Sequence, residues 1–420
     1  MLLFFPIFLT FSFALSPTPT VDLNILKLFI PSLFIIWLIK SLFQKKIIID
    51  NRPRFWLLIT FLTVTFLSII WSPAQTPAFR KLLFFVSTIP LYFVFYQAQQ
   101  NKKFLLRFLK ILIVSTFFAS LLALIPFILQ FIIGLNPVLN FLRQFIAPFF
   151  LGHSLANLVN QYSSWLVNIS GHTILRTFGT FPDPHLFSLY LAMILPLTLY
   201  FYQRTNQKKY LFYFSTILLT ILFSFSRGAY LSLIIGGLFL FLTNRPFNLL
   251  RKHLLFFYSL FVIILFLVII PNPLTNRLSS SFSIQEGSNN GRLEMWLVAL
   301  NTIEKHPLIG VGLAGFADRL DSSLGIRNPI YAHNLLLDFG AETGIINMFI
   351  LLFLITSPII FYLTTKLSLK NQILSKYLAL SFLIFFVHSL FETPFFSIHV
   401  FPLFLILLAI NPTYSSHSKE

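Results

Sequence analysis

The sequence contains no cysteine and few charged residues. Without thiols, disulfides, thiolate metal sites and cysteine nucleophiles are excluded. Charged residues make up only 10% of the chain, whereas soluble domains carry about 25%. The chain also lacks low-complexity tracts and any linker to a separate soluble domain. These absences predict a single integral membrane domain over residues 1–420.

Apolar side chains dominate what is present. Hydrophobic residues account for 57% of the chain, phenylalanine alone for 55 residues, and the mean hydropathy is +0.84. Because a helix needs roughly 20 apolar residues to cross a bilayer, we expect an all-α polytopic membrane protein with about twelve transmembrane helices and a large outer loop containing short helices. The apolar runs centre on 2–16, 25–43, 55–72, 82–97, 108–134, 185–203, 210–225, 229–243, 254–270, 342–363, 376–391 and 394–410. The first run lacks a basic leader and a good cleavage site, which favours an uncleaved helix over a signal peptide.

The basic residues predict how these helices are oriented. Although the net charge is +18, lysine and arginine lie mostly in short breaks between apolar runs and do not cluster on one soluble face. This distribution argues against a nucleic-acid partner and follows the positive-inside pattern. We therefore expect a multi-pass protein of the cytoplasmic (inner) membrane with both termini in the cytoplasm. The loops at 135–184 and 271–333 and the turn at 226–228 then face outward.

The two long outer loops differ in character. Residues 138–166 are amphipathic and predict either an interfacial helix on the outer membrane surface or a re-entrant piece. The loop at 271–333 is richer in Gly, Asn, His and charges of both signs. Residues 310–315 in it match GxGxxG, but no soluble strand-helix unit surrounds them. We interpret these glycines as shaping a tight turn and not as a nucleotide site.

Three arginines on the predicted outer side are candidates for ligand binding. Arg227 lies between two apolar runs, where a charge beside lipid usually serves a partner and a snorkelling anchor is the plainer alternative. Arg292 follows an Asn-Asn-Gly turn and is expected to open a helix, where its charge opposes the helix dipole. Pairing with a nearby glutamate is the structural alternative. Arg176 lies in RTFGTFPDPHLF, close to the start of the next apolar run.

His333 is the candidate for acid-base chemistry. It and Asn334 precede a helix that begins LLLDFGAETG, and either residue would cap that helix. A neutral imidazole would accept a proton from a sugar hydroxyl, although a lone histidine is more often structural. Asp338 and Glu342, four residues apart on one helix face, would orient His333, pair with an arginine or only solvate the helix. No histidine spacing typical of a metal site is present, so we expect neither metal nor cofactor.

Several arginines and one histidine on one membrane face indicate a ligand that is both lipidic and anionic. Arginine binds phosphate oxygens in pairs and stays charged. A polyprenyl-diphosphate-linked sugar fits this description and would lie beside membrane lipid. Arg227, Arg292 and Arg176 would bind its diphosphate and stabilise it as the leaving group without a metal ion.

Four stretches resemble the O-antigen ligase and O-antigen polymerase family of membrane glycosyltransferases. They are SRGAYLSL at 226–233, GRLEMWLVAL with HPLIGVGLAGF within 291–316, YAHNLLLDFGAETG at 331–344, and RTFGTFPDPHLF at 176–187. His333, Asn334 and Gly344 match the ligase pattern of His, a polar residue, nine residues and Gly. Asn347 departs from the Gly, Thr or Tyr that ligases favour three residues later. The resemblance covers roughly 176–363.

The resemblance implies a GT-C-like fold and metal-independent transfer of an undecaprenyl-diphosphate-linked glycan. Arg227 and Arg292 would hold the diphosphate, and His333 would activate or position the acceptor hydroxyl. The acceptor would be a lipid-anchored saccharide (ligase), the end of another repeat unit (polymerase) or a protein side chain (oligosaccharyltransferase). A transporter or flippase for such glycans is the rival, but it would place polar groups at mid-membrane, whereas ionisable residues here collect at one face. A structural scaffold would leave the outer arginines unexplained.

Overall fold

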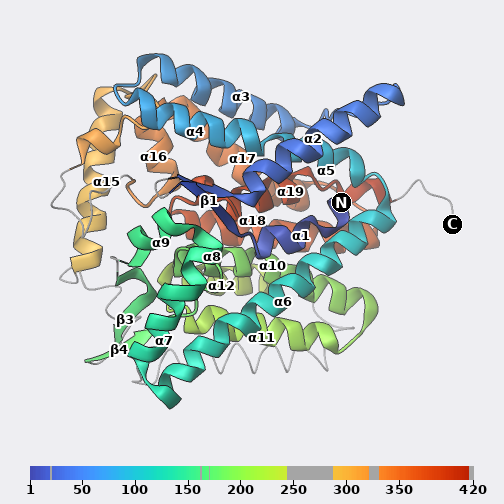
Figure 1. Ribbon diagram of the computed structural model, residues 1–420. Helices are drawn as coiled ribbons and strands as arrows, with labels where there is room; N and C mark the ends of the chain where they lie inside the picture. The colour runs from blue at the N-terminus through green and yellow to red at the C-terminus, as the bar shows by residue number, and fades with distance from the viewer. Residues whose placement is uncertain (19–20, 161–162, 170, 244–286, 321–330, 416–420) are drawn as a thin grey trace.

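The structure, a computed structural model, describes residues 1–18, 21–160, 163–169, 171–243, 287–320 and 331–415 (Figure 1). Within these ranges the chain is a bundle of helices with two small antiparallel hairpins. The predicted helical class is therefore confirmed. The first hairpin pairs β1 (Ala14–Thr18) with β2 (Val21–Asn24), and the second pairs β3 (Leu166–Ile169) with β4 (His172–Leu175).

Seven helical segments in the described ranges are long and apolar enough to cross a membrane, which fits a membrane protein. The predicted count of about twelve is not confirmed, and the run at 254–270 lies outside the described residues. The seven segments comprise α2 (Ile25–Phe43), α3 with its extension (Pro53–Leu67, Ser68–Trp71), α4 with α5 (Gln75–Thr88, Pro90–Ala98), α6 (Lys102–Ile133), α10 (Pro184–Thr205), α17 (Ile345–Thr364) and α18 (Leu369–Ser389). Three shorter apolar helices are α11 (Lys209–Phe223), α12 (Arg227–Thr243) and α19 (Val400–Ala409).

Two helices form the centre of the bundle. In α10 and α18 the most apolar stretch is 89% and 78% buried, against 22% in α2 and 28% in α17. α10 packs against α18, α11 and α6, and α18 packs against α17 and α12 (Figure 1). The outer helices carry exposed Leu, Ile and Phe side chains, as expected for surfaces that face lipid. The central pair is thus held by protein on nearly all sides.

The first apolar run does not form the expected membrane-crossing helix. After one short turn, α1 (Phe5–Thr10) lasts six residues and gives way to the β1–β2 hairpin. Six helical residues rise only about 9 Å. Phe5 and Leu9 are fully buried in the core, which explains why an apolar run here does not indicate a span.

The loop at 135–184 does not form one interfacial helix. It folds as α7 (Leu135–Phe141), a π-helical turn (Leu142–Ile146), α8 (Ala147–Leu151) and α9 (His153–Asn160), followed by the β3–β4 hairpin. Gly134 and Gly152 take φ values of +89° and +87°; Gly134 ends α6 before this group, and Gly152 separates α8 from α9. The amphipathic residues of this loop therefore form several short helices.

The described part of the polar segment ends in two helices beside the bundle. α15 (Gly287–Lys305) stands at one edge and packs against the short α16 (Leu335–Thr343) (Figure 1). The glycines of 310–315 form the expected turn between them: Gly310 and Gly312 have positive φ, and the amides of Val311 and Gly312 donate to the carbonyls of Ala341 and Glu342. These two hydrogen bonds therefore hold the turn against the end of α16.

Candidate functional site

His333 lies directly before α16, in a backbone conformation that is uncommon for residues other than glycine. Asn334 caps the helix, because its side-chain oxygen accepts from the amides of Leu336 and Leu337 at 3.1 and 3.2 Å. His333 itself has φ +53°, a left-handed value that non-glycine residues adopt at a cost. Its side chain remains 32% exposed.

Glu392 is the partner of His333. It lies in the short connection between α18 and α19, and its Oε1 atom is 3.1 Å from His333 Nδ1. Burial alone lowers the pKa of His333, but the charge and hydrogen bond of Glu392 outweigh it and raise that pKa above its ordinary value. Burial likewise opposes ionisation of Glu392, and His333 nevertheless holds the pKa of this carboxyl well below its usual range. The two side chains therefore favour a protonated His333 beside an ionised Glu392, and His333 becomes a neutral base as the pH rises through its raised pKa.

This pair fixes which nitrogen of His333 faces a substrate. Carboxylate oxygens only accept, so Nδ1 carries a proton towards Glu392. Nε2 has no hydrogen-bond partner among the described residues. Any proton exchanged with a hydroxyl group would therefore pass through Nε2.

Asp338 forms hydrogen bonds with residues next to both members of the pair. One carboxyl oxygen accepts from the amide of Ala332 at 2.6 Å, and the other accepts from the hydroxyl of Thr393. These contacts tie the residue before His333 to the residue after Glu392. Burial raises the pKa of Asp338 to about 7, against the opposing effect of both hydrogen bonds. We interpret Asp338 as a positioning residue, and its expected role of orienting His333 stays a prediction.

Arg292 reaches this site from α15. The helix begins at Gly287, so the expectation that Arg292 opens it is wrong: the Asn-Asn-Gly stretch is helical and Arg292 lies in the second turn. Trp296, four residues later on the same helix face, donates from Nε1 to the carbonyl of Ala332 at 2.9 Å. The positive charge of Arg292 helps to lower the pKa of Glu392 and opposes protonation of His333. Arg292 therefore lies within electrostatic reach of the pair.

A second polar cluster joins the starts of α10 and α12 to the end of α18. The His185 ring contacts the Arg176 guanidinium at 3.4 Å through Nε2 and the Ser226 hydroxyl at 3.0 Å through Nδ1. Ser226 Oγ is also 3.5 Å from His388 Nε2. Arginine can only donate, so His185 Nε2 must accept and Nδ1 must carry the proton. The chain of contacts places Arg227, the first residue of α12, next to this cluster.

The two clusters belong to one site. Asp183 caps α10 by accepting from the amide of His185 at 2.6 Å. Burial raises the pKa of Asp183, the charge of Glu392 raises it further, and Arg176 opposes both. A side chain at Gly228 would approach the His388 ring to 3.5 Å, so α12 starts tight against the end of α18. Charges from both clusters therefore act on one another.

Arg176 has a different environment from the other two arginines. It is 5% exposed, and its guanidinium donates to the carbonyls of Ser224 and Ser164 at 2.6 and 3.1 Å. These bonds hold the turn before α12 against the β-hairpin region. Its predicted part in binding a diphosphate stays a prediction, and its contacts give it a structural task.

Glu342 points to a cation that the sequence analysis missed. Lys81 of α4 forms an ion pair with Glu342 at 2.7 Å, so Glu342 pairs with neither His333 nor an arginine. The Lys81 ammonium also lies 5.1 Å from the Tyr331 ring and 4.6 Å from the Phe396 ring, which stack on each other. Lys81 belongs to a Lys-Arg pair on the predicted outer side, where basic residues are not favoured. That signal, already used for Arg227, would have identified it.

Glu392 was also missed, although a signal existed. It stands between two apolar runs in FETPF, and an ionisable residue in such a place usually serves a function.

Gly344 ends α16 with φ +88°, where an added Cβ atom would lie 2.1 Å from the Leu308 carbonyl oxygen. Among the described residues, no group of three or more His, Asp and Glu is arranged to hold a metal ion.

Comparison with known proteins identifies the domain that carries much of this site. Residues 212–352 match the family model described as O-antigen ligase. No curated protein matches the chain. The match includes Arg227, Arg292 and His333, whereas Arg176 and Glu392 lie outside it. The family indicates glycan transfer of the O-antigen ligase kind in polysaccharide biosynthesis. Over residues 212–352 the chain thus carries the domain of the O-antigen ligase family of membrane proteins, which confirms the resemblance drawn from its motifs.

Proposed function

We propose that the protein transfers a glycan from an undecaprenyl-diphosphate-linked donor to an acceptor on the outer face of the cytoplasmic membrane. The observation that carries this proposal is the His333–Glu392 pair, with the charge of Arg292 within reach of it. A base and a cation at one site suit a reaction in which a hydroxyl attacks and a phosphate leaves.

Each residue of the site has its own role in the proposed reaction. The acceptor hydroxyl forms the new bond to the anomeric carbon, and its proton passes to Nε2 of His333. The bond from that carbon to the diphosphate oxygen breaks, and the lipid diphosphate leaves with the negative charge. Arg292 and Arg227 stabilise this charge as it develops, and Glu392 stabilises the imidazolium that forms. Charge balance is thus kept within the site, and the proposal requires no metal ion.

The ligase reaction, with a lipid-anchored saccharide as acceptor, is the first choice because His333, Asn334 and Gly344 follow the ligase pattern. Polymerisation of lipid-linked repeat units and transfer to a protein side chain use the same donor. They differ only in the source of the hydroxyl. The acceptor arms of the experiment distinguish these three reactions.

The test is reconstitution of the full chain with an undecaprenyl-diphosphate glycan and each acceptor class. We expect Arg227→Ala, Arg292→Ala and His333→Ala to lose transfer while they insert and fold normally. Lys305→Ala, which removes an exposed charge from the last turn of α15, serves as the matched control and should keep wild-type activity. We also expect full activity in EDTA.

Two results would reject the proposal. Undiminished transfer by all three site variants would refute the assignment of the site. Movement of the donor across the membrane without a new glycosidic bond would instead identify a flippase.

A further inference from the structure

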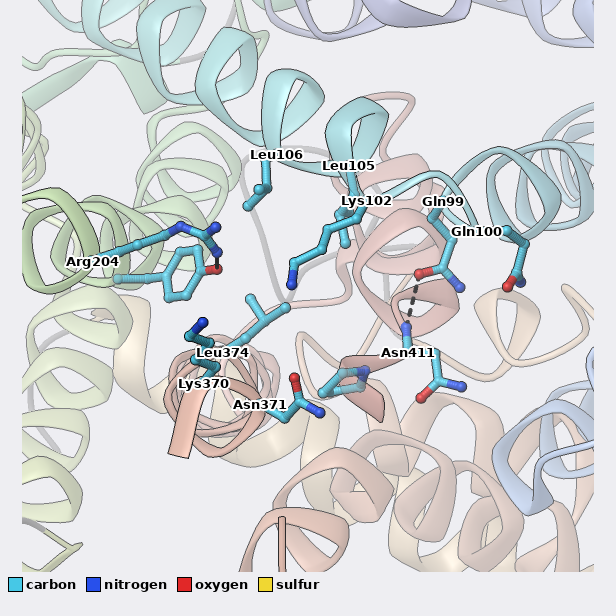
Figure 2. Close-up of a pocket in the computed structure, with 12 residues that line it drawn as sticks. Gln99, Gln100, Lys102, Leu105, Leu106, Arg204, Lys370, Asn371, Leu374 and Asn411 are labelled. Carbon is cyan, nitrogen blue, oxygen red and sulfur yellow. Dashed lines mark hydrogen bonds between the residues drawn. The ribbon is translucent and has the colours of Figure 1, made fainter. Parts of the chain in front are cut away.

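A basic pocket, drawn in close-up in Figure 2, lies beside the end of α10 and the start of α18, at the end of the bundle opposite the candidate site. It is lined by residues from the start of α6, the end of α10, the start of α18 and the segment after α19. α10 begins at the site with His185 and ends at the pocket with Arg204, and α18 runs the other way, from Lys370 to His388. Nineteen residues of helix between His185 and Arg204 span about 28 Å, close to the thickness of a bilayer core. The pocket and the site therefore lie at opposite membrane surfaces.

Three cations face one another across this pocket. Figure 2 shows the side chains of Lys102, Arg204 and Lys370 converging on the same space. The charges of Arg204 and Lys370 both act on the Lys102 ammonium. Arg204 donates to the Tyr200 hydroxyl at 2.8 Å, a neutral group that does not itself balance the charge. Among the described residues that line the pocket, none carries a carboxylate. Three like charges held together in this way favour a bound anion.

The rest of the pocket suits an amphiphilic anion. Leu105, Leu106 and Leu374 supply apolar wall, whereas amide side chains line the opposite part. Asn371 is 5% exposed, and its Oδ1 atom has no hydrogen-bond partner in the described part of the chain. A hydroxyl group of a ligand would satisfy this buried acceptor.

Internal hydrogen bonds hold the pocket in shape. Gln99 donates to the carbonyl of Ala409 at 3.1 Å and accepts from the amide of Asn411 at 3.0 Å. These bonds fix the segment after α19 against the connection between α5 and α6 (Figure 2). The cations are therefore presented by a rigid frame formed from segments far apart in the sequence.

We propose that this pocket binds a phosphate-bearing anion, with Lys102, Arg204 and Lys370 on the phosphate and Asn371 on a hydroxyl of the same ligand. Two sources share this chemistry: the headgroup of an anionic phospholipid such as phosphatidylglycerol, and free phosphate. Basic pockets between membrane helices at the headgroup level are suited to the first.

The experiment uses the purified full chain in neutral detergent and measures ligand binding by thermal shift and native mass spectrometry. The probes are short-chain phosphatidylglycerol, short-chain phosphatidylcholine and inorganic phosphate. The pocket variant combines Lys102→Gln, Arg204→Gln and Lys370→Gln. The matched control combines Lys103→Gln, Arg107→Gln and Lys366→Gln, which removes the same charge from exposed residues that do not line the pocket.

We expect phosphatidylglycerol to bind the wild type and the control, and to bind the pocket variant at least about tenfold more weakly. Asn371→Leu should weaken phosphatidylglycerol binding while leaving the affinity for inorganic phosphate unchanged. If inorganic phosphate binds as tightly as the lipid and displaces it, free phosphate is the ligand. Equal binding of phosphatidylcholine, or equal losses in the pocket variant and the control, would overturn the proposal. Single substitutions of Arg204 and Lys370, both exposed, preserve the test if the triple variant does not fold.

Discussion

His333 combines a costly backbone conformation with a charged neighbour. Its left-handed φ requires the surrounding structure to hold it, and Asn334, Asp338 and Trp296 all bond to the residues around it. Its identity as a candidate followed from the sequence, because it follows a polar loop on the predicted outer side of an apolar chain. Its partner Glu392 lies 59 residues later. A single sequence contains no local signal for such a pairing.

Replacing Glu392 by glutamine should change the pH dependence of transfer. The Glu392 charge raises the pKa of His333, so its removal lowers that pKa. Because the base must be neutral, wild-type kcat/KM should rise with pH through the raised pKa, and the variant should complete this rise at lower pH. We expect its maximal rate to fall about 10- to 100-fold. The measurement is kcat/KM against pH, with Glu304→Gln on exposed α15 surface as control. If kcat/KM of the variant rose over the same pH range as that of the wild type, the assigned role of Glu392 would be contradicted.

Asp338 should tolerate asparagine better than alanine. The asparagine oxygen still accepts from the amide of Ala332, and its amide group donates to the Thr393 hydroxyl. Alanine leaves a buried amide unsatisfied, which costs about 1–3 kcal/mol. Burial raises the pKa of Asp338 from 3.8 to about 7, so its contribution to stability is lost as pH rises through that range. Thermal unfolding should show this pH dependence in the wild type and less of it in Asp338→Asn. Equal melting temperatures for the alanine and asparagine variants would show that these contacts are unimportant.

At the scale of elements, local signals predicted the caps and the turn but not every helix boundary. Asn334 caps α16 and the glycines of 310–315 turn, because both features depend on neighbouring residues only. α15 starts five residues before Arg292, because the turn preference of Asn-Asn-Gly is a weak local preference that the rest of a fold can override. α1 is short for a similar reason: an apolar run can be buried by protein as well as by lipid. The missed features are those that tertiary packing decides.

The turn at 310–315 should be sensitive to an added methyl group. A Cβ atom at Gly312 would lie 2.4 Å from Ser72 Cα, and the residue has φ +89°. Gly171 provides the matched control, because its φ is +86° but an added Cβ meets nothing within 4 Å. We expect Gly312→Ala to lower the melting temperature clearly more than Gly171→Ala, whose cost is about 1–2 kcal/mol of backbone strain. Equal shifts would mean that close approach to Ser72 does not require glycine.

On the scale of the whole molecule, the site assembles from segments that are distant in the sequence. Lys81 and Glu342 pair across 261 residues, and His333 and Glu392 across 59. Apolar runs predicted most of the helices, and arginines on the predicted outer side suggested part of the candidate site. Which helix faces meet depends on packing between helices of similar composition, which periodicity in one chain does not encode.

The predicted orientation is directly testable because the chain has no cysteine. We expect Lys305→Cys, at the exposed end of α15, to react with a membrane-impermeant maleimide in intact cells. Lys208→Cys, exposed between α10 and α11, should react only after the membrane is opened. Transfer assays on both variants verify that the protein is folded. Labelling of Lys208→Cys alone in intact cells would invert the topology and refute an outer-face reaction.

The burial of α10 sets a limit on how its length can vary. Inserting or deleting one residue at its middle would turn one half by about 100° relative to the other and shift it by about 1.5 Å. Protein surrounds this helix on nearly all sides, so rotating either half would disturb its packing. Either His185 would move away from the candidate site or Arg204 would move away from the pocket. The length of α10 therefore fixes the distance between the candidate site and the basic pocket. Tolerated insertions should be confined to connections, such as the exposed residues 206–208.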